Sequence, residues 1–283
     1  MQHVVIVGLG LIGGSFALGL RKAGFTGTIT GVSSPRTVRA ALEMGVIDQA
    51  LPLEEAARQG DLFLLSQPIS NILETLQVLD PLVENGALVT DVGSTKREIV
   101  DTARRCLHKA LFIGGHPMAG KESRGVQAAD PDLFVGRTWF LAPIVNEDLE
   151  RPPVFELIGW IKRMAATPIP ISAQDHDHLV AFTSHLPQLA STALANAVRL
   201  GVPPDQAAVG TGPGLLDMSR IAQSDFEIWR DIIRTNSHQI ELALDTYIRL
   251  LSELRNSLGS PLLEERFESA SDTARLLRKT VHG

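Results

Sequence analysis

The hydrophobic pattern of the chain changes near residue 171. Before that point, short apolar runs alternate with segments whose apolar residues recur every three or four positions. Short apolar runs are typical of strands buried on both faces, and the wider spacing is typical of amphipathic helices. Their alternation predicts βαβ units with right-handed crossovers and a mainly parallel sheet. We therefore expect residues 1–171 to form an α/β domain.

From about residue 173 onwards the pattern is helical, and no convincing strand is present. Strands are predicted at residues 3–7, 28–32, 62–65, 87–92, 111–114, 138–142 and 168–171, and helices at 11–23, 35–45, 94–108, 174–200, 223–257 and 261–281. The last three helices are separated by segments rich in Gly and Pro. We expect residues 172–283 to form an all-α domain, and the acidic segment 146–150 to be a solvated loop.

The predicted C-terminal helices carry wide apolar faces and have little sheet to cover them. Exposed apolar faces mark interfaces, and most oligomers are symmetric. We therefore expect a homodimer formed through the helical domain.

A glycine motif connects the first predicted strand to the first predicted helix. Gly8 permits a tight turn, Gly10 lets the backbone approach a pyrophosphate, and Gly13 lets helix and strand pack closely. The helix start, with Leu11 and Ile12, presents unpaired N–H groups to phosphates. A purely structural turn is the alternative, but the strand–turn–helix context predicts a Rossmann-type dinucleotide-binding domain.

The residues after the second predicted strand bear on the choice of cofactor. NAD-specific domains place a carboxylate there to bind the ribose 2′-hydroxyl. Here the strand is followed by Ser33, Ser34 and Arg36, and the next carboxylate is Glu43, well into the following helix. Hydroxyls and a guanidinium suit a 2′-phosphate, so we expect NADP rather than NAD. Alternatively, Ser34 and Pro35 only begin a helix, and the site accepts either nucleotide.

Composition narrows the class of protein. A length of 283 residues fits two domains, and a net charge of −6 argues against a nucleic-acid surface. No apolar run is long enough to span a bilayer, and the apolar N-terminal stretch is interrupted by glycines, unlike a signal peptide. The single cysteine, Cys106, excludes an internal disulfide and a cysteine-based metal site. We expect a cytoplasmic protein without nucleic-acid or membrane partners.

Two polar residues follow predicted strands at the edge where such sheets bind ligands. Ser94 comes after the strand at 87–92, although capping of the next helix would also explain it. His116 is bracketed by glycines and followed by Pro117, which predicts a rigid loop at the ligand edge. Because such loops concentrate catalytic groups, we expect His116 to be functional.

The helical half has three further candidates. The tetrad at residues 175–178, Asp-His-Asp-His, allows a metal site, but a charged helix start is the favoured interpretation, and no metal is expected. His185 stands beside Pro187, which predicts a kink of the kind that often marks a site. Arg220 is a candidate for bidentate recognition of a carboxylate.

Taken together, these segments resemble the prephenate/arogenate dehydrogenase family of tyrosine biosynthesis. The resemblance rests on five segments in order, which cover essentially the whole chain: Gly8-x-Gly10-x-x-Gly13, Asp91-Val-Gly-Ser-Thr-Lys96, Gly115-His116-Pro-Met-Ala-Gly120, Ser184-His185-Leu-Pro187, and Asp217-Met-Ser-Arg220-Ile-Ala with Trp229-Arg-Asp231. It implies NAD(P)-dependent oxidative decarboxylation of a cyclohexadienol carboxylate, with an active site between a nucleotide-binding domain and a helical dimerisation domain.

The resemblance also implies roles for individual residues. His116 would be the base that takes the hydroxyl proton, and Ser94 would bridge that hydroxyl and the nicotinamide. Arg220 would hold a substrate carboxylate, with His185 as a second substrate contact. Glu122 and Asp217 are candidates for a gating ion-pair network near the substrate. Prephenate and arogenate differ only in a side chain remote from the chemistry, so the preferred substrate stays open, as does inhibition by tyrosine.

Two other readings remain as alternatives. A β-hydroxyacid dehydrogenase also joins a Rossmann domain to a helical one, but it needs a catalytic lysine early in the helical domain. No lysine occurs between Arg163 and Arg278, which disfavours that class. A catalytically silent NAD(P)-sensing protein is disfavoured by His116 and Arg220 in their motifs.

Overall fold

The computed structural model describes residues 1–282, which fall into two compact units. The first unit is Met1–Ser237, and the second is His238–Gly283. An eight-stranded sheet and most of the helices belong to the first unit, whereas the second is built from two long helices. Among the described residues, no helix combines the length and the apolar character that crossing a membrane would require.

The sheet has the strand order β3-β2-β1-β4-β5-β6-β7-β8. Its strands are β1 (His3–Val7), β2 (Thr28–Val32), β3 (Gln49–Ala50), β4 (Leu62–Leu65), β5 (Leu88–Asp91), β6 (Leu111–Pro117), β7 (Thr138–Pro143) and β8 (Thr167–Pro170). All neighbours pair in parallel except β6 and β7. This confirms the expected mainly parallel Rossmann-type sheet, whose strand order reverses between β1 and β4, where ligands bind.

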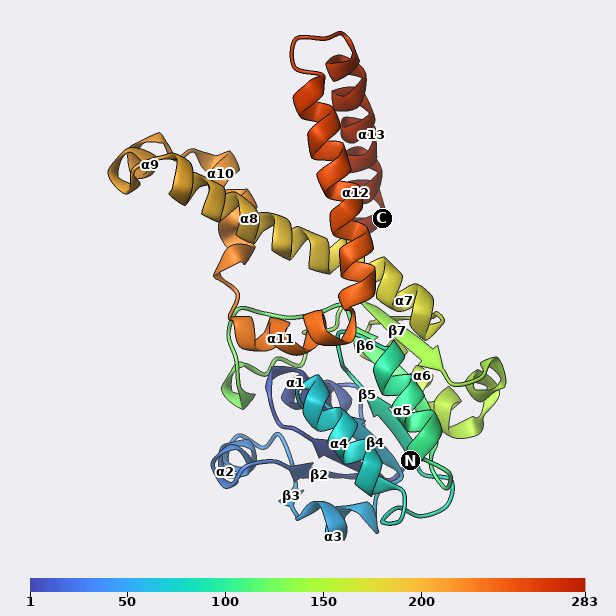
Figure 1. Ribbon diagram of the computed structural model, residues 1–283. Helices are drawn as coiled ribbons and strands as arrows, with labels where there is room; N and C mark the ends of the chain where they lie inside the picture. The colour runs from blue at the N-terminus through green and yellow to red at the C-terminus, as the bar shows by residue number, and fades with distance from the viewer. Residues whose placement is uncertain (283) are drawn as a thin grey trace. The chain divides into compact units, whose positions relative to one another are not determined.

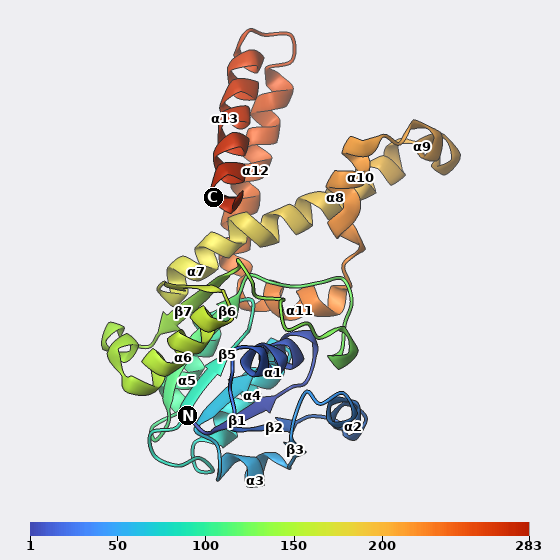
Figure 2. The same ribbon diagram turned by 180° about the vertical axis from the view of Figure 1, so that it is seen from behind.

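Helices cover both faces of the sheet. Figure 1 shows α4 (Ile69–Leu79) and α5 (Arg97–Cys106) over one face, and Figure 2 shows α1 (Leu11–Lys22) and α6 (Pro152–Arg163) over the other. Two shorter helices, α2 (Pro35–Glu43) and α3 (Leu53–Ala57), flank β3 in the sequence.

Successive residues of β1 supply both cores. Val4 and Ile6 pack with Phe16 of α1, whereas Val5 and Val7 belong to the cluster that includes residues of α4 and α5. A strand covered on both faces must be apolar at every position, which is why β1 shows no alternation of polar and apolar residues.

The first unit continues into a series of helices. These are α7 (Ala173–Val180), a π-helical segment (Ala181–His185), α8 (Leu186–Gly201), α9 (Pro204–Gly210), α10 (Pro213–Ser219), a 3₁₀ turn (Arg220–Gln223) and α11 (Phe226–Thr235). The π-helical segment lies where a kink at Pro187 was expected, and Pro187 itself stands in the first turn of α8.

Polar contacts fix α11 to the sheet domain. The carboxylate of Asp231 accepts a hydrogen bond from the Ser70 amide at the start of α4, at 2.8 Å. Thr235 and Thr95 share a hydroxyl–hydroxyl hydrogen bond of 2.7 Å. These contacts hold Asp231 and Thr235 of α11 against the segments that follow β4 and β5.

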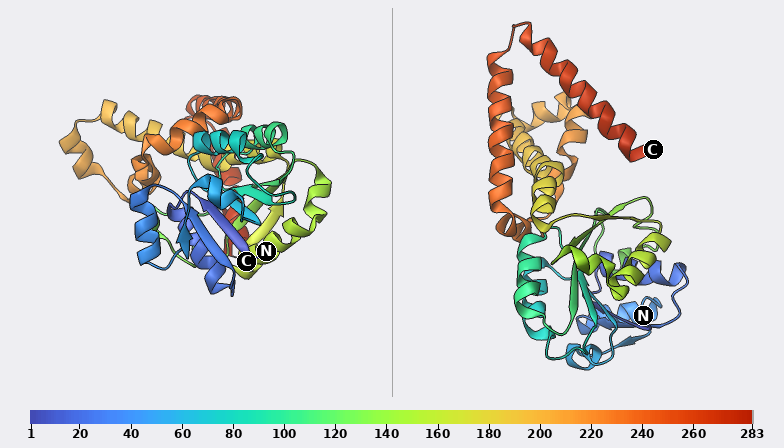
Figure 3. Two further views of the ribbon diagram at one scale, coloured as in Figure 1. Left: turned by 90° about the horizontal axis from the view of Figure 1, so that it is seen from below. Right: turned by 90° about the vertical axis from the view of Figure 1, so that its right-hand side faces the viewer.

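The second unit consists of α12 (Ser237–Asn256) and α13 (Leu262–His282). The two helices diverge from the turn that joins them, as the right panel of Figure 3 shows. Arg266 of α13 forms an ion pair of 2.9 Å with Glu253 of α12. Several large apolar side chains of this unit are exposed, including Phe267, which is 68% exposed.

Some elements differ from those predicted. The hydrophobic pattern did not predict β3, α3, α4, α6, α9 or α10, and residues 146–150, expected as a solvated loop, form a 3₁₀ turn. The buried residues of α4 have the helical spacing (Ile69, Ile72, Leu73, Leu76 and Leu79), so that helix was readable from the sequence. The helix predicted at 223–257 is divided at Asn236 into α11 and α12.

Candidate active site

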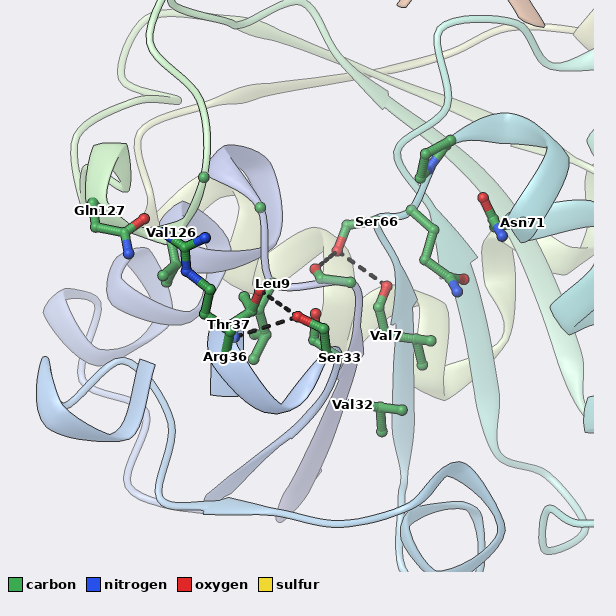
Figure 4. Close-up of a pocket in the computed structure, with 16 residues that line it drawn as sticks. Val7, Leu9, Val32, Ser33, Arg36, Thr37, Ser66, Asn71, Val126 and Gln127 are labelled. Carbon is green, nitrogen blue, oxygen red and sulfur yellow. Dashed lines mark hydrogen bonds between the residues drawn. The ribbon is translucent and has the colours of Figure 1, made fainter. Parts of the chain in front are cut away.

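A cavity of about 800 Å³ lies at the carboxyl ends of β1, β2 and β4 (Figure 4). Gly8 and Gly10 border it on the β1 side, and Ser33, Ser34 and Arg36 border it on the β2 side. Figure 4 shows Arg36 and Gln127 on one side of the cavity and Asn71 on the other. The structure thus brings together the glycine motif and the residues expected to bind the 2′ position of the ribose.

The first turn of α1 is prepared to bind an anion. Its N-cap residue is Gly10, and no side chain caps the helix, so its first N–H groups are available to phosphate oxygens. A Cβ on Gly10 would meet nothing within 4 Å, which leaves the space beside that backbone free for a ligand. The uncapped helix and the adjoining cavity fit a dinucleotide.

Gly8 and Gly13 have structural reasons to be glycine. Gly8 has a φ of +98°, a conformation that side chains disfavour. A Cβ on Gly13 would lie 2.2 Å from the Gly8 carbonyl oxygen and 2.4 Å from the Ser66 hydroxyl, so only glycine fits between helix and turn. Leu11 and Ile12 follow at the start of α1 and also line a second cavity.

The start of α2 is both a helix cap and a wall of the nucleotide cavity. The Ser34 hydroxyl accepts a hydrogen bond of 3.4 Å from the Thr37 amide, so Ser34 does cap α2, as the alternative interpretation held. Ser33 and Arg36 are exposed. No Asp or Glu is among the described residues that line this cavity.

A buried ion pair lies at the end of β5. The Asp91 carboxylate accepts hydrogen bonds from the Lys96 ammonium, from the Gly93 amide at 2.7 Å and from the Gly115 amide at 3.1 Å. Lys96 and Asp91 are both fully buried. Burial lowers the pKa of Lys96, although the attraction of Asp91 and Asp177 opposes that shift. The pair joins the carboxyl ends of β5 and β6.

Next to this ion pair, His116 lies within β6 rather than on the loop expected after it. The strand extends to Pro117 because it pairs with β7, where His116 is opposite Phe140. The Nδ1 atom of His116 is 2.8 Å from Nε2 of His176. Burial lowers the pKa of His116 well below its usual value, and the neighbouring basic groups His176, Lys96 and His185 lower it further.

His176 and Asp177 are functional candidates, although their sequence context predicts only a charged helix start. That interpretation holds for Asp175 and His178, which are exposed, but His176 and Asp177 are buried. Buried residues 176, 177, 180 and 181 are spaced as one helical face, which was the signal available in the sequence. Within residues 1–282, no group of three or more His, Cys, Asp or Glu side chains is arranged to hold a metal ion.

Asp177, and not Ser94, caps the start of α5. It accepts hydrogen bonds from the Lys96 amide at 2.6 Å and the Arg97 amide at 2.9 Å, and so caps α5 from another part of the chain. The helix begins at Arg97, so Ser94 is not its N-cap. Ser94 is half-buried in the loop after β5.

His185 closes the same cluster from the π-helical segment. It is buried, with Nδ1 3.3 Å from the Asn236 amide nitrogen, and its ring packs edge-on against Trp229 at 5.9 Å. Burial lowers its pKa to about 4, although Asp177 opposes that shift. A neutral imidazole can both accept and donate a hydrogen bond.

A second cavity, of about 1300 Å³, contains the residue expected to bind a substrate carboxylate. Arg220 and Glu122 line it and form an exposed ion pair of 3.4 Å. Asp217 is exposed on α10. His116, Ser94 and His185 are not among the described residues that line this cavity. The structure therefore groups the histidines in one cluster and Arg220 with Glu122 in another.

The two cavities are neighbours. Gly10, Ser66 and Gly125 border both of them. A nucleotide in the first cavity would therefore reach the entrance of the second.

Comparisons with known proteins identify both halves of the chain. Residues 16–156 match the model of the prephenate dehydrogenase nucleotide-binding domain, and residues 172–270 match that of the prephenate dehydrogenase dimerization domain. A prephenate dehydrogenase of Lactococcus lactis is 33% identical over 275 residues, covering 95% of this chain and 75% of the relative.

Solved structures give the same result. The crystal structure of prephenate dehydrogenase from Aquifex aeolicus, in complex with hydroxyphenyl propionate and NAD+, has a TM-score of 0.89 and 29% identity, covering 98% of each chain. The crystal structure of Synechocystis arogenate dehydrogenase has a TM-score of 0.83 and 29% identity, covering 97% of this chain and 99% of that one.

Proposed function

The chain belongs to the prephenate dehydrogenase family, and we propose that it catalyses the NAD(P)-dependent oxidative decarboxylation of prephenate, arogenate or both. The observation that carries this proposal is His116, a histidine kept neutral at the carboxyl end of β6, beside a fold built to bind a dinucleotide. A neutral imidazole at that edge is suited to take a hydroxyl proton.

Each candidate residue has a part in this reaction. His116 accepts the proton of the ring hydroxyl, and Ser94 bridges that hydroxyl and the cofactor. Arg220 binds a substrate carboxylate, His185 makes a second substrate contact, and Glu122, with Asp217, controls access to Arg220.

The residues around the first cavity would hold the cofactor. The backbone of Gly8, Gly10 and Gly13, with the start of α1, would bind the pyrophosphate. When bound, an oxidised nicotinamide would supply the acceptor for the hydride of the carbinol carbon. Loss of the proton to His116 and of CO2 from the ring then leaves an aromatic product.

We further propose NADP as the preferred cofactor, with Ser33, Ser34 and Arg36 at the 2′-phosphate. The absence of Asp and Glu among the described lining residues supports this, because a carboxylate there would repel the phosphate. Arg36 is exposed beside the cavity, where its guanidinium could pair with that phosphate.

We also propose a homodimer that associates through residues 172–283, with the nucleotide-binding domain at residues 1–171. The dimerization-domain match and the exposed apolar side chains of α12 and α13 support this assembly. The single unpaired cysteine fits a reducing compartment, so we place the reaction in the cytoplasm.

A steady-state assay tests the activity. Purified protein should convert prephenate or arogenate to the aromatic product, with one CO2 released and one nicotinamide reduced per turnover. Both substrates and both cofactors should be compared. Reduction of cofactor by a simple β-hydroxyacid, but by neither cyclohexadienol, would contradict the proposal.

A further inference from the structure

Three side chains form a continuous hydrogen-bonded series that ends at His116. Asp177 Oδ1 is 2.8 Å from His176 Nδ1, and His176 Nε2 is 2.8 Å from His116 Nδ1. His176 and Asp177 are buried, and His116 is half-buried. The series joins the first turns of α7 to the end of β6.

The direction of each hydrogen bond follows from the acceptor at its start. Both oxygens of Asp177 already accept backbone N–H groups, from Lys96 and Arg97, so the carboxylate can only accept from His176. The proton of neutral His176 must therefore reside on Nδ1. Its Nε2 then has a lone pair, which can only accept a hydrogen bond from Nδ1–H of His116.

We propose that Asp177 and His176 are positioning residues that fix His116 as its Nδ1–H tautomer. In this form the lone pair of His116 lies on Nε2, the nitrogen left to act as the base. When Nε2 takes the substrate hydroxyl proton, the Nδ1–H of the resulting imidazolium remains hydrogen-bonded to His176, and that ring remains hydrogen-bonded to Asp177. The inference rests on the proposed function only for its kinetic part.

Ring packing supports the same arrangement. His176 makes edge-on contacts with His116 at 5.0 Å and with Phe140 of β7 at 5.4 Å. Phe140 is directly opposite His116 in the β6–β7 register. The two imidazoles are thus held at a fixed mutual angle by a strand pair on one side and α7 on the other.

Burial, rather than the surrounding charges, keeps the rings of the series neutral. His116 faces Lys96 from the loop before α5, His176 from α7 and His185 from the π-helical segment. His176 faces Lys96 too, and also Asp177 and Asp91, whose negative charges oppose the lowering of its pKa. Burial lowers the pKa of both His116 and His176, which keeps one proton on each ring near neutral pH.

The tautomer can be measured directly. We would record ¹⁵N NMR spectra of histidine-labelled full-length protein above pH 7 and assign His116 by its loss in His116→Asn. The expected result is a protonated Nδ1 and a bare Nε2 on His116. A protonated Nε2 on His116 would overturn the proposal, whether or not the enzyme is active.

Two substitutions test the acceptors. Asp177→Ala removes the acceptor of the His176 Nδ1 proton, so that proton can move to Nε2 of His176, which would reverse its hydrogen bond with His116 and place the proton of His116 on Nε2. We expect kcat to fall roughly 100-fold or more with little change in KM, as wrong-tautomer substitutions do in other relays. The matched control is Asp175→Ala, at an exposed carboxylate two residues away, which should leave both readouts unchanged.

His176 gives a second pair of variants, which carries the test if Asp177→Ala does not fold. His176→Phe removes the acceptor, so His116 should populate both tautomers and kcat should fall about 10-fold or more. His176→Gln restores an acceptor oxygen and should recover most of the loss. Unchanged tautomer and kcat in His176→Phe would overturn the proposal, whereas an inactive wild type with the expected tautomer would contradict only the proposed function.

Discussion

At the scale of single residues, the pKa of His116 decides when the enzyme has a base. Burial is the largest cause that lowers this pKa, and the neighbouring basic groups lower it further. The neutral form therefore predominates at neutral pH. We expect kcat/KM to stay level above pH 6.5 and to fall only as the pH drops through the lowered pKa. A pH profile in buffers of constant ionic strength would check this, and a fall already complete near pH 7 would contradict it.

Substitution of His116 should separate chemistry from binding. His116→Asn removes the base but keeps a polar side chain, so kcat should fall by roughly 10²–10⁴-fold. Nucleotide affinity should stay close to that of the wild type, because His116 does not line the nucleotide cavity. Near wild-type turnover would show that another group takes the proton.

Arg220 should affect substrate binding in particular. Arg220→Ala loses a charge-assisted contact to the substrate carboxylate, so KM for the substrate should rise about 10-fold or more while nucleotide affinity changes little. Arg220→Lys should recover only part of the loss, because an ammonium cannot bind a carboxylate bidentately. The control is Arg58→Ala, at an exposed arginine after α3, and weakened nucleotide binding in the Arg220 variants would contradict the assignment.

At the scale of elements, the segment between β2 and α2 should set cofactor preference. Arg36→Ala removes the positive charge beside the cavity, so kcat/KM for NADP should fall roughly 10-fold while that for NAD changes little. Arg39→Ala is the matched control, since Arg39 is exposed on the same helix but does not line the cavity. A tenfold preference of the wild type for NAD would instead show that Ser33 and Ser34 serve a 2′-hydroxyl.

The sequence predicted those parts of the site that are set by residues close together in the chain, and not those that depend on distant residues. The strands at 28–32 and 62–65 and the glycine turn are set by local pattern, and they were predicted correctly. The start of α5 was not, because its capping carboxylate, Asp177, is 80 residues away from Arg97. The extension of β6 through His116 likewise depends on pairing with β7. Neither Asp177 nor β7 is predicted as a partner by the residues that surround the start of α5 or the end of β6 in the chain.

At the scale of the whole molecule, the exposed apolar surface of α13 should be buried in solution by a second copy. Phe267→Glu places a charge on that surface, so sedimentation velocity should show a shift from dimer to monomer. Phe155→Glu is a matched control, because Phe155 on α6 is also 68% exposed but lies outside the helical domain. A wild type that sediments as a monomer at micromolar concentration would refute the proposed assembly.

Asp177 has two roles at once, which limits how this scaffold can be redesigned. Its two oxygens bind the amides that begin α5 and also His176, so one carboxylate serves both the stability of the fold and the base. Random mutagenesis for altered activity should find this position intolerant, since any replacement disturbs both tasks at once. Variation that survives is expected at sites with a single task, such as Ser33 and Arg36. New cofactor preferences are therefore more accessible to this fold than a new base.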